Sequence, residues 1–213
     1  KYAGDYYSPR GHKYIREFRM GSVATTIYRI GGVILQKERI LVSNENRVLV
    51  AYTLLEAHSA TTLRLRPFFA FRNKHALAKA NMDANGRSYP ITGGVKCKLY
   101  ENYPWLYIQT NKADAEFVAA PDWYYDFEYQ QELQRGYDGY EDLMTTGYFE
   151  LKIKKGESII FSASTEEMSA TLSSVAEAVR VCEDEIKRNE YAFQIQGNRN
   201  PFIDHPSYAD LIW

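Results

Sequence analysis

The chain has 213 residues and a net charge of −1, so its charge does not favour a polyanion or an acidic membrane as partner. No apolar run approaches the roughly 20 residues that a membrane span needs, and the N-terminal residues lack the apolar stretch of a secretory signal. Cys97 and Cys182 lie far apart in the sequence and form no metal-ligand pattern. These features favour a reduced, cytoplasmic protein with one domain or one domain and an appendage.

The first two-thirds of the chain predicts β-strands. Residues 25–30 and 33–42 meet at Gly31-Gly32, a pair suited to a tight hairpin. Residues 47–55 follow with apolar side chains at every second position, as in a strand with one buried face. Residues 61–65 continue this alternation until Pro67, which predicts an edge strand or a bend.

Later segments extend the β pattern. Residues 72–94 are polar and contain glycine, so we expect a long loop, and residues 95–100 and 105–110 predict short strands. Residues 147–164 predict a hairpin with its turn at Lys155-Gly156. Strands joined by short connections, with no helices between them, predict a mainly β chain that forms a large antiparallel β-sandwich.

The pattern changes after Ser164. Ser164 and Glu167 have the spacing of a capping box. The apolar positions that follow recur every three or four residues: Leu172, Val175, Val179, Cys182 and Ile186. This stripe predicts an amphipathic helix from about residue 166 to 191, or two shorter helices, so the fold class is a sandwich followed by a C-terminal α-helical segment.

Residues 123–142, WYYDFEYQQELQRGYDGYED, combine many aromatic rings with carboxylates and follow neither the helical nor the strand period. This pattern predicts a loop. Sugar rings stack on Trp and Tyr faces, while sugar hydroxyls bind carboxylate and Arg partners. The candidate substrate-binding residues are Trp123, Tyr125, Tyr129, Arg135, Glu141 and Asp142. The alternative is a loop that packs its rings against the sandwich and satisfies its own acids.

No residue is assigned a catalytic or metal-binding role. Hydrolysis of a glycosidic bond uses two opposed carboxylates, and the neighbours Glu141 and Asp142 would point apart in an extended chain. The sequence has no phosphate-binding glycine motif, no nucleophile elbow and no paired His or Cys ligands. We therefore expect no cofactor.

The order of residues in 121–157 closely resembles the N-terminal domain of bacterial and archaeal glycogen debranching enzymes. That family carries a Trp-aromatic-x-x-Phe-Glu-Tyr element, then Glu-x-x-Arg-Gly-x-Asp, then Glu-Asp-Leu, and all three are present. Residues 11–20, 25–57 and 63–77 also resemble the family's earlier strands. The matching segments cover residues 11–168, and the family domain is expected to span about residues 1–180.

This resemblance implies a supersandwich-like fold and a partner. The family hydrolyses α-1,6 branches of glycogen-like polymers with carboxylates in a C-terminal (α/α)-barrel, for which this chain has no room. We therefore expect a domain cut at both ends that is not catalytic by itself. Its expected partners are the catalytic barrel and an α-glucan such as glycogen, without nucleic acid or membrane. A purely structural module that docks on the barrel is the alternative.

Residues 185–213 resemble a different family, the C-terminal end of bacterial endonuclease I. The matching residues Asn198, Arg199 and His205 are expected to be structural, because that family's general-base His and metal motifs are not found here. The expected division is a sandwich over 1–168, a helical connection over 169–184 and this tail over 185–213. The apolar tail would dock on the sandwich, pair with another copy as a homo-oligomer, or stay mobile.

Overall fold

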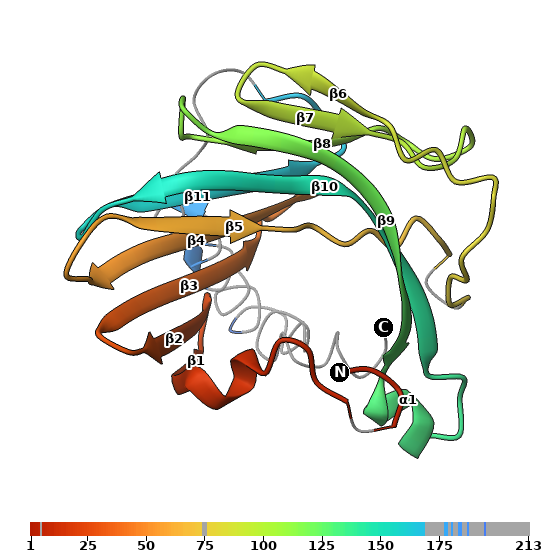
Figure 1. The fold of residues 1–213 in the computed structure, drawn as a ribbon, viewed down its shortest axis with the longest axis horizontal. Coiled ribbons are helices and arrows are strands. Elements are labelled where there is room, and N and C mark those ends of the chain that lie inside the picture. Colours follow the sequence, from red (N-terminus) through yellow and green to blue (C-terminus); the bar gives the residue numbers. More distant parts are fainter. Residues whose placement is uncertain are drawn as a thin grey trace.

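The computed structural model describes residues 1–4, 6–73 and 76–168, together with residues 177, 178, 180, 183, 184, 187 and 194. Within this part of the chain, two antiparallel β-sheets account for nearly all regular structure (Figure 1). The 3-10 helix η1 (Gly11–Tyr14) precedes the first strand, and one short helix, α1 (Gln130–Gln134), interrupts the later strands. The predicted mainly β, antiparallel fold is confirmed.

The larger sheet has eight strands in the order β1-β2-β3-β4-β11-β8-β7-β6. Their bounds are β1 (Ile15–Met20), β2 (Ala24–Ile30), β3 (Val33–Leu41), β4 (Arg47–Glu56), β6 (Ser88–Ile91), β7 (Gly94–Cys97), β8 (Leu106–Thr110) and β11 (Ser158–Ser164). The hairpin between β2 and β3 is confirmed, since Ile30 pairs with Val33 and Gly31 has a φ of 57°. Glycine takes such a left-handed conformation without steric cost.

The smaller sheet has three strands in the order β5-β10-β9. They are β5 (Thr61–Leu65), β9 (Glu116–Glu128) and β10 (Tyr140–Ile153). β5 is an edge strand and ends before Pro67, as predicted. In Figure 1, β9 and β10 curve together away from the larger sheet and carry α1 at their far end. We call this extension, residues 123–142, the hairpin arm.

The main core lies between the two sheets. Leu54, Val95, Ile108 and Ile159 reach it from the larger sheet. The smaller sheet contributes residues of β10, namely Met144, Phe149, Leu151 and Ile153. Each of these side chains is at most 6% exposed, so burial of apolar area from both layers stabilises their packing.

The predicted hairpin of residues 147–164 is wrong in its pairing. β10 and β11 belong to different sheets, so the turn at Lys155-Gly156 carries the chain from one layer to the other. This turn bonds to β4 instead: Gly156 N donates to Leu54 O at 2.8 Å, and Leu54 N donates to Glu157 O at 3.1 Å. An arch between layers buries alternate residues as a hairpin does, so the periodicity does not distinguish the two.

Two predicted loops also contain strands. The loop expected over residues 72–94 includes β6, which pairs with β7. The loop expected over 123–142 is the hairpin arm, made from the end of β9, α1 and the start of β10. Pairing between β9 and β10 is irregular between Glu141 and Leu143, and Asp126 has a φ of 58°. Such irregularities break the alternation of faces, which explains the apparent lack of a strand period.

The helix predicted from residue 166 does not begin there. Ser164 is the last residue of β11, and its Oγ accepts a hydrogen bond from Glu166 N at 3.1 Å, while residues 165–168 are not helical. Most of the predicted helix and tail lies outside the described residues. Ala178, which is described, packs with Ile40, Val42 and Leu49.

Candidate functional site

The hairpin arm holds the segment at residues 72–80 through a buried carboxylate. Glu141 is 0% exposed, and its carboxylate accepts hydrogen bonds from three directions. Arg72 donates from Nε to Oε1 and from Nη2 to Oε2, the latter at 3.2 Å. Ala78 N donates to Oε1 at 3.0 Å, and the Tyr129 hydroxyl donates to Oε2 at 2.6 Å. Both oxygens of this carboxylate therefore accept hydrogen bonds from groups of the protein itself.

The charges of this network shift two pKa values in opposite directions. Burial alone would raise the pKa of Glu141, but the hydrogen bonds from Arg72, Ala78 and Tyr129 outweigh it and hold the pKa below its ordinary value. Burial, and then the hydrogen bond to Glu141, raises the pKa of Tyr129 to about 12. At neutral pH, Glu141 is thus a carboxylate and Tyr129 a hydroxyl donor.

Asp142 makes a second attachment beside the first. Its side chain is nearly buried, and its carboxylate accepts hydrogen bonds from Ala80 N at 3.0 Å and Asp126 N at 2.9 Å. Its own backbone N donates to Ala78 O at 2.9 Å. Glu141 and Asp142 therefore join residues 72–80 to the hairpin arm, which matches the alternative in which the acids satisfy the protein's own groups.

The other three candidate residues lie apart from this network. Trp123 is half-buried and packs against the main core. Arg135 lies just after α1 and pairs with Glu132 at 3.1 Å. Tyr125 is 57% exposed and points to the surface. The structure thus brings together Tyr129, Glu141 and Asp142, and it separates Trp123, Tyr125 and Arg135 from them.

A row of aromatic rings runs beside Tyr125 that the sequence pattern did not single out. Phe68 contacts Tyr124 with centroids 4.8 Å apart and Phe127 at 5.4 Å. Tyr2 continues the row, 4.9 Å from Phe127 and 6.1 Å from Tyr6. Tyr2, Tyr6 and Tyr125 line an open pocket of 350 Å³ with Ala3, Ser8 and Asp126. We call this the tyrosine pocket. In the sequence, the N-terminal tyrosines were the feature that could have indicated this pocket. Their contact with the hairpin arm, however, depends on the fold.

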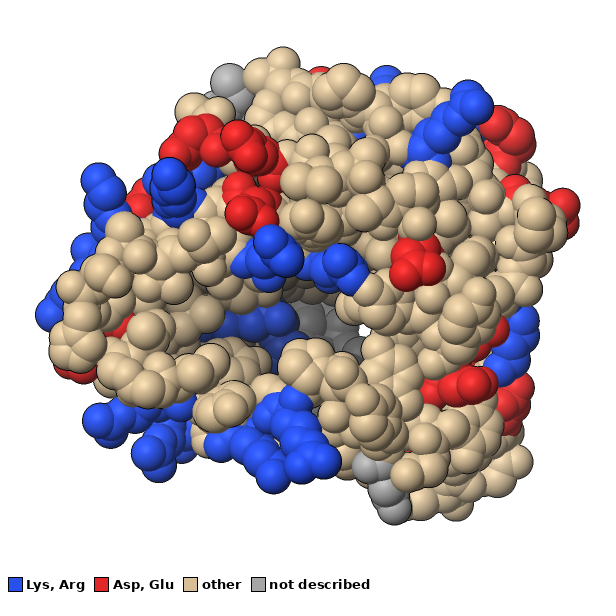
Figure 2. All heavy atoms as spheres, in the orientation of Figure 1, with Lys and Arg blue, Asp and Glu red and all other residues tan. Residues whose placement is uncertain are grey.

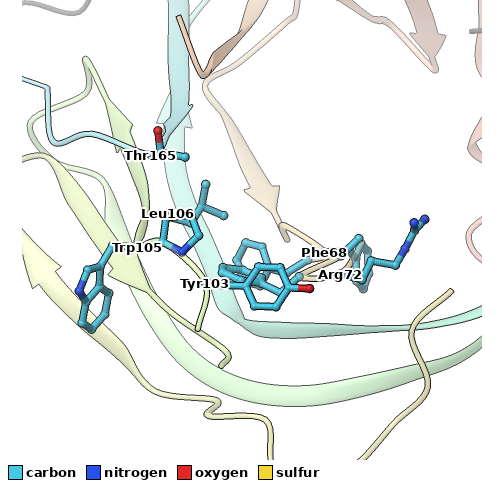
Figure 3. A pocket seen from close by; sticks show the side chains of 10 residues that line it. Phe68, Arg72, Tyr103, Trp105, Leu106 and Thr165 are labelled. Carbon is cyan, nitrogen blue, oxygen red and sulfur yellow. The ribbon is translucent and has the colours of Figure 1, made fainter. Parts of the chain in front are cut away.

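A second aromatic pocket of 260 Å³ lies where the segment after β5 meets the approach to β8. Its rings come from Phe68, Phe69, Phe71, Tyr103 and Trp105. Figure 3 shows these segments around the pocket, with Arg72 directed away from Trp105. The guanidinium of Arg72 is bonded to Glu141, so the lining of this pocket is mainly apolar. Such a lining suits packing against a ring more than recognition of a charged group.

The described residues include one cysteine, Cys97. Cys97 is buried in the main core, and burial raises the pKa of its thiol to about 12, which makes it unreactive. Among the described residues, no group of three or more His, Cys, Asp or Glu side chains is placed to hold a metal ion. In the same part of the chain, no helix is long and apolar enough to cross a membrane.

Comparison with known proteins gives two family matches. The family model described as "Glycogen debranching enzyme N terminal" matches residues 1–160, and the one described as "Endonuclease I" matches residues 139–207. Both include residues 139–160, which contain β10. The chain is also 34% identical over 139 residues to the "Extracellular ribonuclease" of Bacillus subtilis (strain 168) and, equally, to that of Bacillus amyloliquefaciens. Each alignment covers 64% of this chain and 41% of the relative's length.

Proposed function

The chain belongs to the glycogen debranching enzyme N-terminal family, and we propose that it serves as the non-catalytic sandwich domain of such a glycoside hydrolase, of the amylo-α-1,6-glucosidase type. In this role it supports a C-terminal (α/α)-barrel in the cytoplasm and contacts α-glucan. The carboxylates that sequence reasoning placed at a sugar site act inside the domain, where they hold the hairpin arm to residues 72–80.

The observation that carries glucan contact is the tyrosine pocket. Tyr6 and Tyr125 are 59% and 57% exposed, so their ring faces are accessible to a sugar. The pocket also holds Asp126 and Ser8, which supply acceptors for sugar hydroxyls. Among the six candidate residues, Tyr125 is therefore the proposed sugar contact. Trp123, Tyr129, Glu141 and Asp142 position the arm, and Arg135 lies at its tip.

Affinity electrophoresis in gels with and without glycogen tests this assignment. Glycogen should retard the unaltered chain, and the double variant Tyr6→Ala, Tyr125→Ala should lose that retardation. Tyr137→Ala is the matched control, because Tyr137 is 66% exposed and lies outside the tyrosine pocket. Equal retardation of the double variant and the control would remove the tyrosine pocket from glucan binding.

The docking alternative makes a different prediction with the same reagents. A purely structural module would show no retardation by glycogen but would associate with a separately expressed barrel domain of the same family. Size-exclusion chromatography of the mixture measures this association directly. Retardation without association would favour the glucan contact, and association without retardation would favour the docking role.

Nuclease activity is a second candidate, favoured by the endonuclease I match and by the similarity to the two ribonucleases. The chain spans only 41% of the length of these relatives, so their activity is a proposal here. Incubation with supercoiled plasmid and with RNA in the presence of Mg²⁺ tests it. Cleavage abolished by EDTA would support this candidate, and intact substrates would dismiss it.

A further inference from the structure

The face of the larger sheet that forms the main core continues beyond the smaller sheet. Pairing across the strands gives one row from the core outward: Ile159, Tyr52, Lys37, Thr26 and Phe18. Ile159 is 0% exposed and Phe18 is 55% exposed. The same face is therefore packed over β11 and β4, is still buried at Thr26 of β2, which is 4% exposed, and becomes an open surface at β1.

A parallel row, two residues along each strand, also ends in an exposed side chain at β1. It runs through Phe161, Val50, Arg39, Ala24 and Met20. Phe161 is 7% exposed and Met20 is 61% exposed. Residues at i and i+2 of a strand point to the same face, so Lys37, which is half-buried, and Arg39, which is exposed, lie side by side on β3 between the core and the exposed edge strand β1.

Lys37 and Arg39 have no acidic partner among the described residues. Lys37 Nζ lies over the ring of Tyr52, 5.4 Å from its centroid. No carboxylate of the described residues forms an ion pair with Lys37 or Arg39. Burial, together with the charge of Arg39, lowers the pKa of Lys37. A partly buried cation beside a second cation is unfavourable by itself, and an anion placed between them would remove the cost.

The surroundings supply an opening and further binding groups. Figure 2 shows a hollow near the middle of the view, with Lys and Arg atoms along its rim and in its depth. Tyr28 and Leu35 pair beside Lys37 on the same face, and Tyr52 lies behind it. The site therefore combines two positive charges with aromatic faces and hydroxyl groups.

We propose that Lys37 and Arg39, with Tyr28 and Tyr52, form a binding site for a phosphorylated sugar on the core-facing side of β3. The phosphate monoester lies between the ammonium and guanidinium groups, and the sugar ring lies against the tyrosines. Two neighbouring cations suit a single phosphate group, whereas a nucleic acid strand would need charges along an extended path. The site is distinct from the tyrosine pocket and does not depend on glucan binding there.

Isothermal titration calorimetry of the full chain tests the site with three probes: glucose 6-phosphate, inorganic phosphate and glucose. We expect glucose 6-phosphate to bind, inorganic phosphate to bind more weakly and glucose to give no heat. Lys37→Met and Arg39→Gln should each weaken glucose 6-phosphate binding at least about tenfold, since each removes a charged donor to phosphate. Arg29→Gln is the control, because Arg29 is exposed and pairs with Ile34 on the opposite face.

Thermal unfolding separates loss of the site from loss of the fold. Lys37→Met removes an uncompensated charge, so this variant should unfold at the same or a higher temperature, and glucose 6-phosphate should stabilise only the unaltered chain and Arg29→Gln. No binding to the unaltered chain, or equal weakening in Arg29→Gln, would overturn the site. If inorganic phosphate binds as tightly as glucose 6-phosphate, the sugar phosphate is not the specific ligand of the site. The same holds if a single-stranded RNA oligomer binds more tightly and the same variants abolish that binding.

Discussion

The Tyr129 hydroxyl donates a hydrogen bond to Glu141 Oε2 at 2.6 Å, across the hairpin arm. Tyr129 precedes α1 and Glu141 follows it, so their hydrogen bond joins the two ends of the segment that contains α1. Arg72 approaches the same carboxylate from the segment after β5. One carboxylate therefore joins the two sides of the hairpin arm to a segment more than 60 residues earlier in the sequence, and its loss should affect both.

Glu141→Gln should lower the free energy of unfolding by about 2–4 kcal/mol, because it removes the charge that compensates Arg72 and leaves a buried polar cluster mismatched. Chemical denaturation followed by circular dichroism measures this change. Glu132→Gln is the control, since Glu132 forms an exposed pair with Arg135 and should change stability by less than about 1 kcal/mol. Similar losses in both variants would contradict the structural role given to Glu141.

Tyr129→Phe keeps the ring and removes only the hydroxyl donor to Glu141. We expect a loss of about 1–2 kcal/mol, typical of a hydrogen bond to a charged acceptor. A double-mutant cycle with Glu141→Gln measures the coupling between the two groups. Additive losses would show that the hydrogen bond contributes nothing beyond the separate packing of the two side chains.

Much of the fold could be predicted because most of the strands bury one face. The alternation of Val48, Val50, Tyr52 and Leu54 predicts β4 correctly, and Gly31-Gly32 predicts its neighbouring hairpin. The partner of each strand was harder to predict. Phe149 and Phe161 lie in opposite sheets and pack against each other with ring centroids 5.2 Å apart. The sequence pattern alone would equally allow the two residues to lie in neighbouring strands of one hairpin and to face the same core.

The candidate site was predicted less well, for a reason that Glu141 and Asp142 make clear. Composition shows that acids and rings are close in sequence, but it does not show which backbone amides will approach them. Ala78 N donates a hydrogen bond to Glu141, and Ala80 N donates one to Asp142. Both amides belong to a segment about 60 residues earlier in the chain. Contacts of such long sequence separation follow from the sheet arrangement and carry no local signature.

Acid should destabilise the chain partly through Glu141. Its pKa in the folded state is lowered, so the unfolded chain binds the proton first as the pH falls. The stability that Glu141 contributes is complete above its unfolded pKa of about 4.3 and is lost as the pH drops below that value. Denaturation between about pH 5 and pH 2 should therefore show a smaller fall in stability for Glu141→Gln than for the unaltered chain. Parallel pH profiles would contradict this.

Gly94→Ala should destabilise the larger sheet where β7 meets β8. A Cβ at Gly94 would lie 2.0 Å from the backbone oxygen of Ile108, and backbone cannot move aside as a flexible side chain can. We expect a loss of about 2–4 kcal/mol, comparable to other forced displacements of packed elements, seen as a lower midpoint of denaturation. Gly21→Ala is the matched control, because a Cβ there meets nothing within 4 Å, and it should be neutral or slightly stabilising. A Gly94→Ala variant as stable as this control would show that β7 and β8 are not held at the spacing described here.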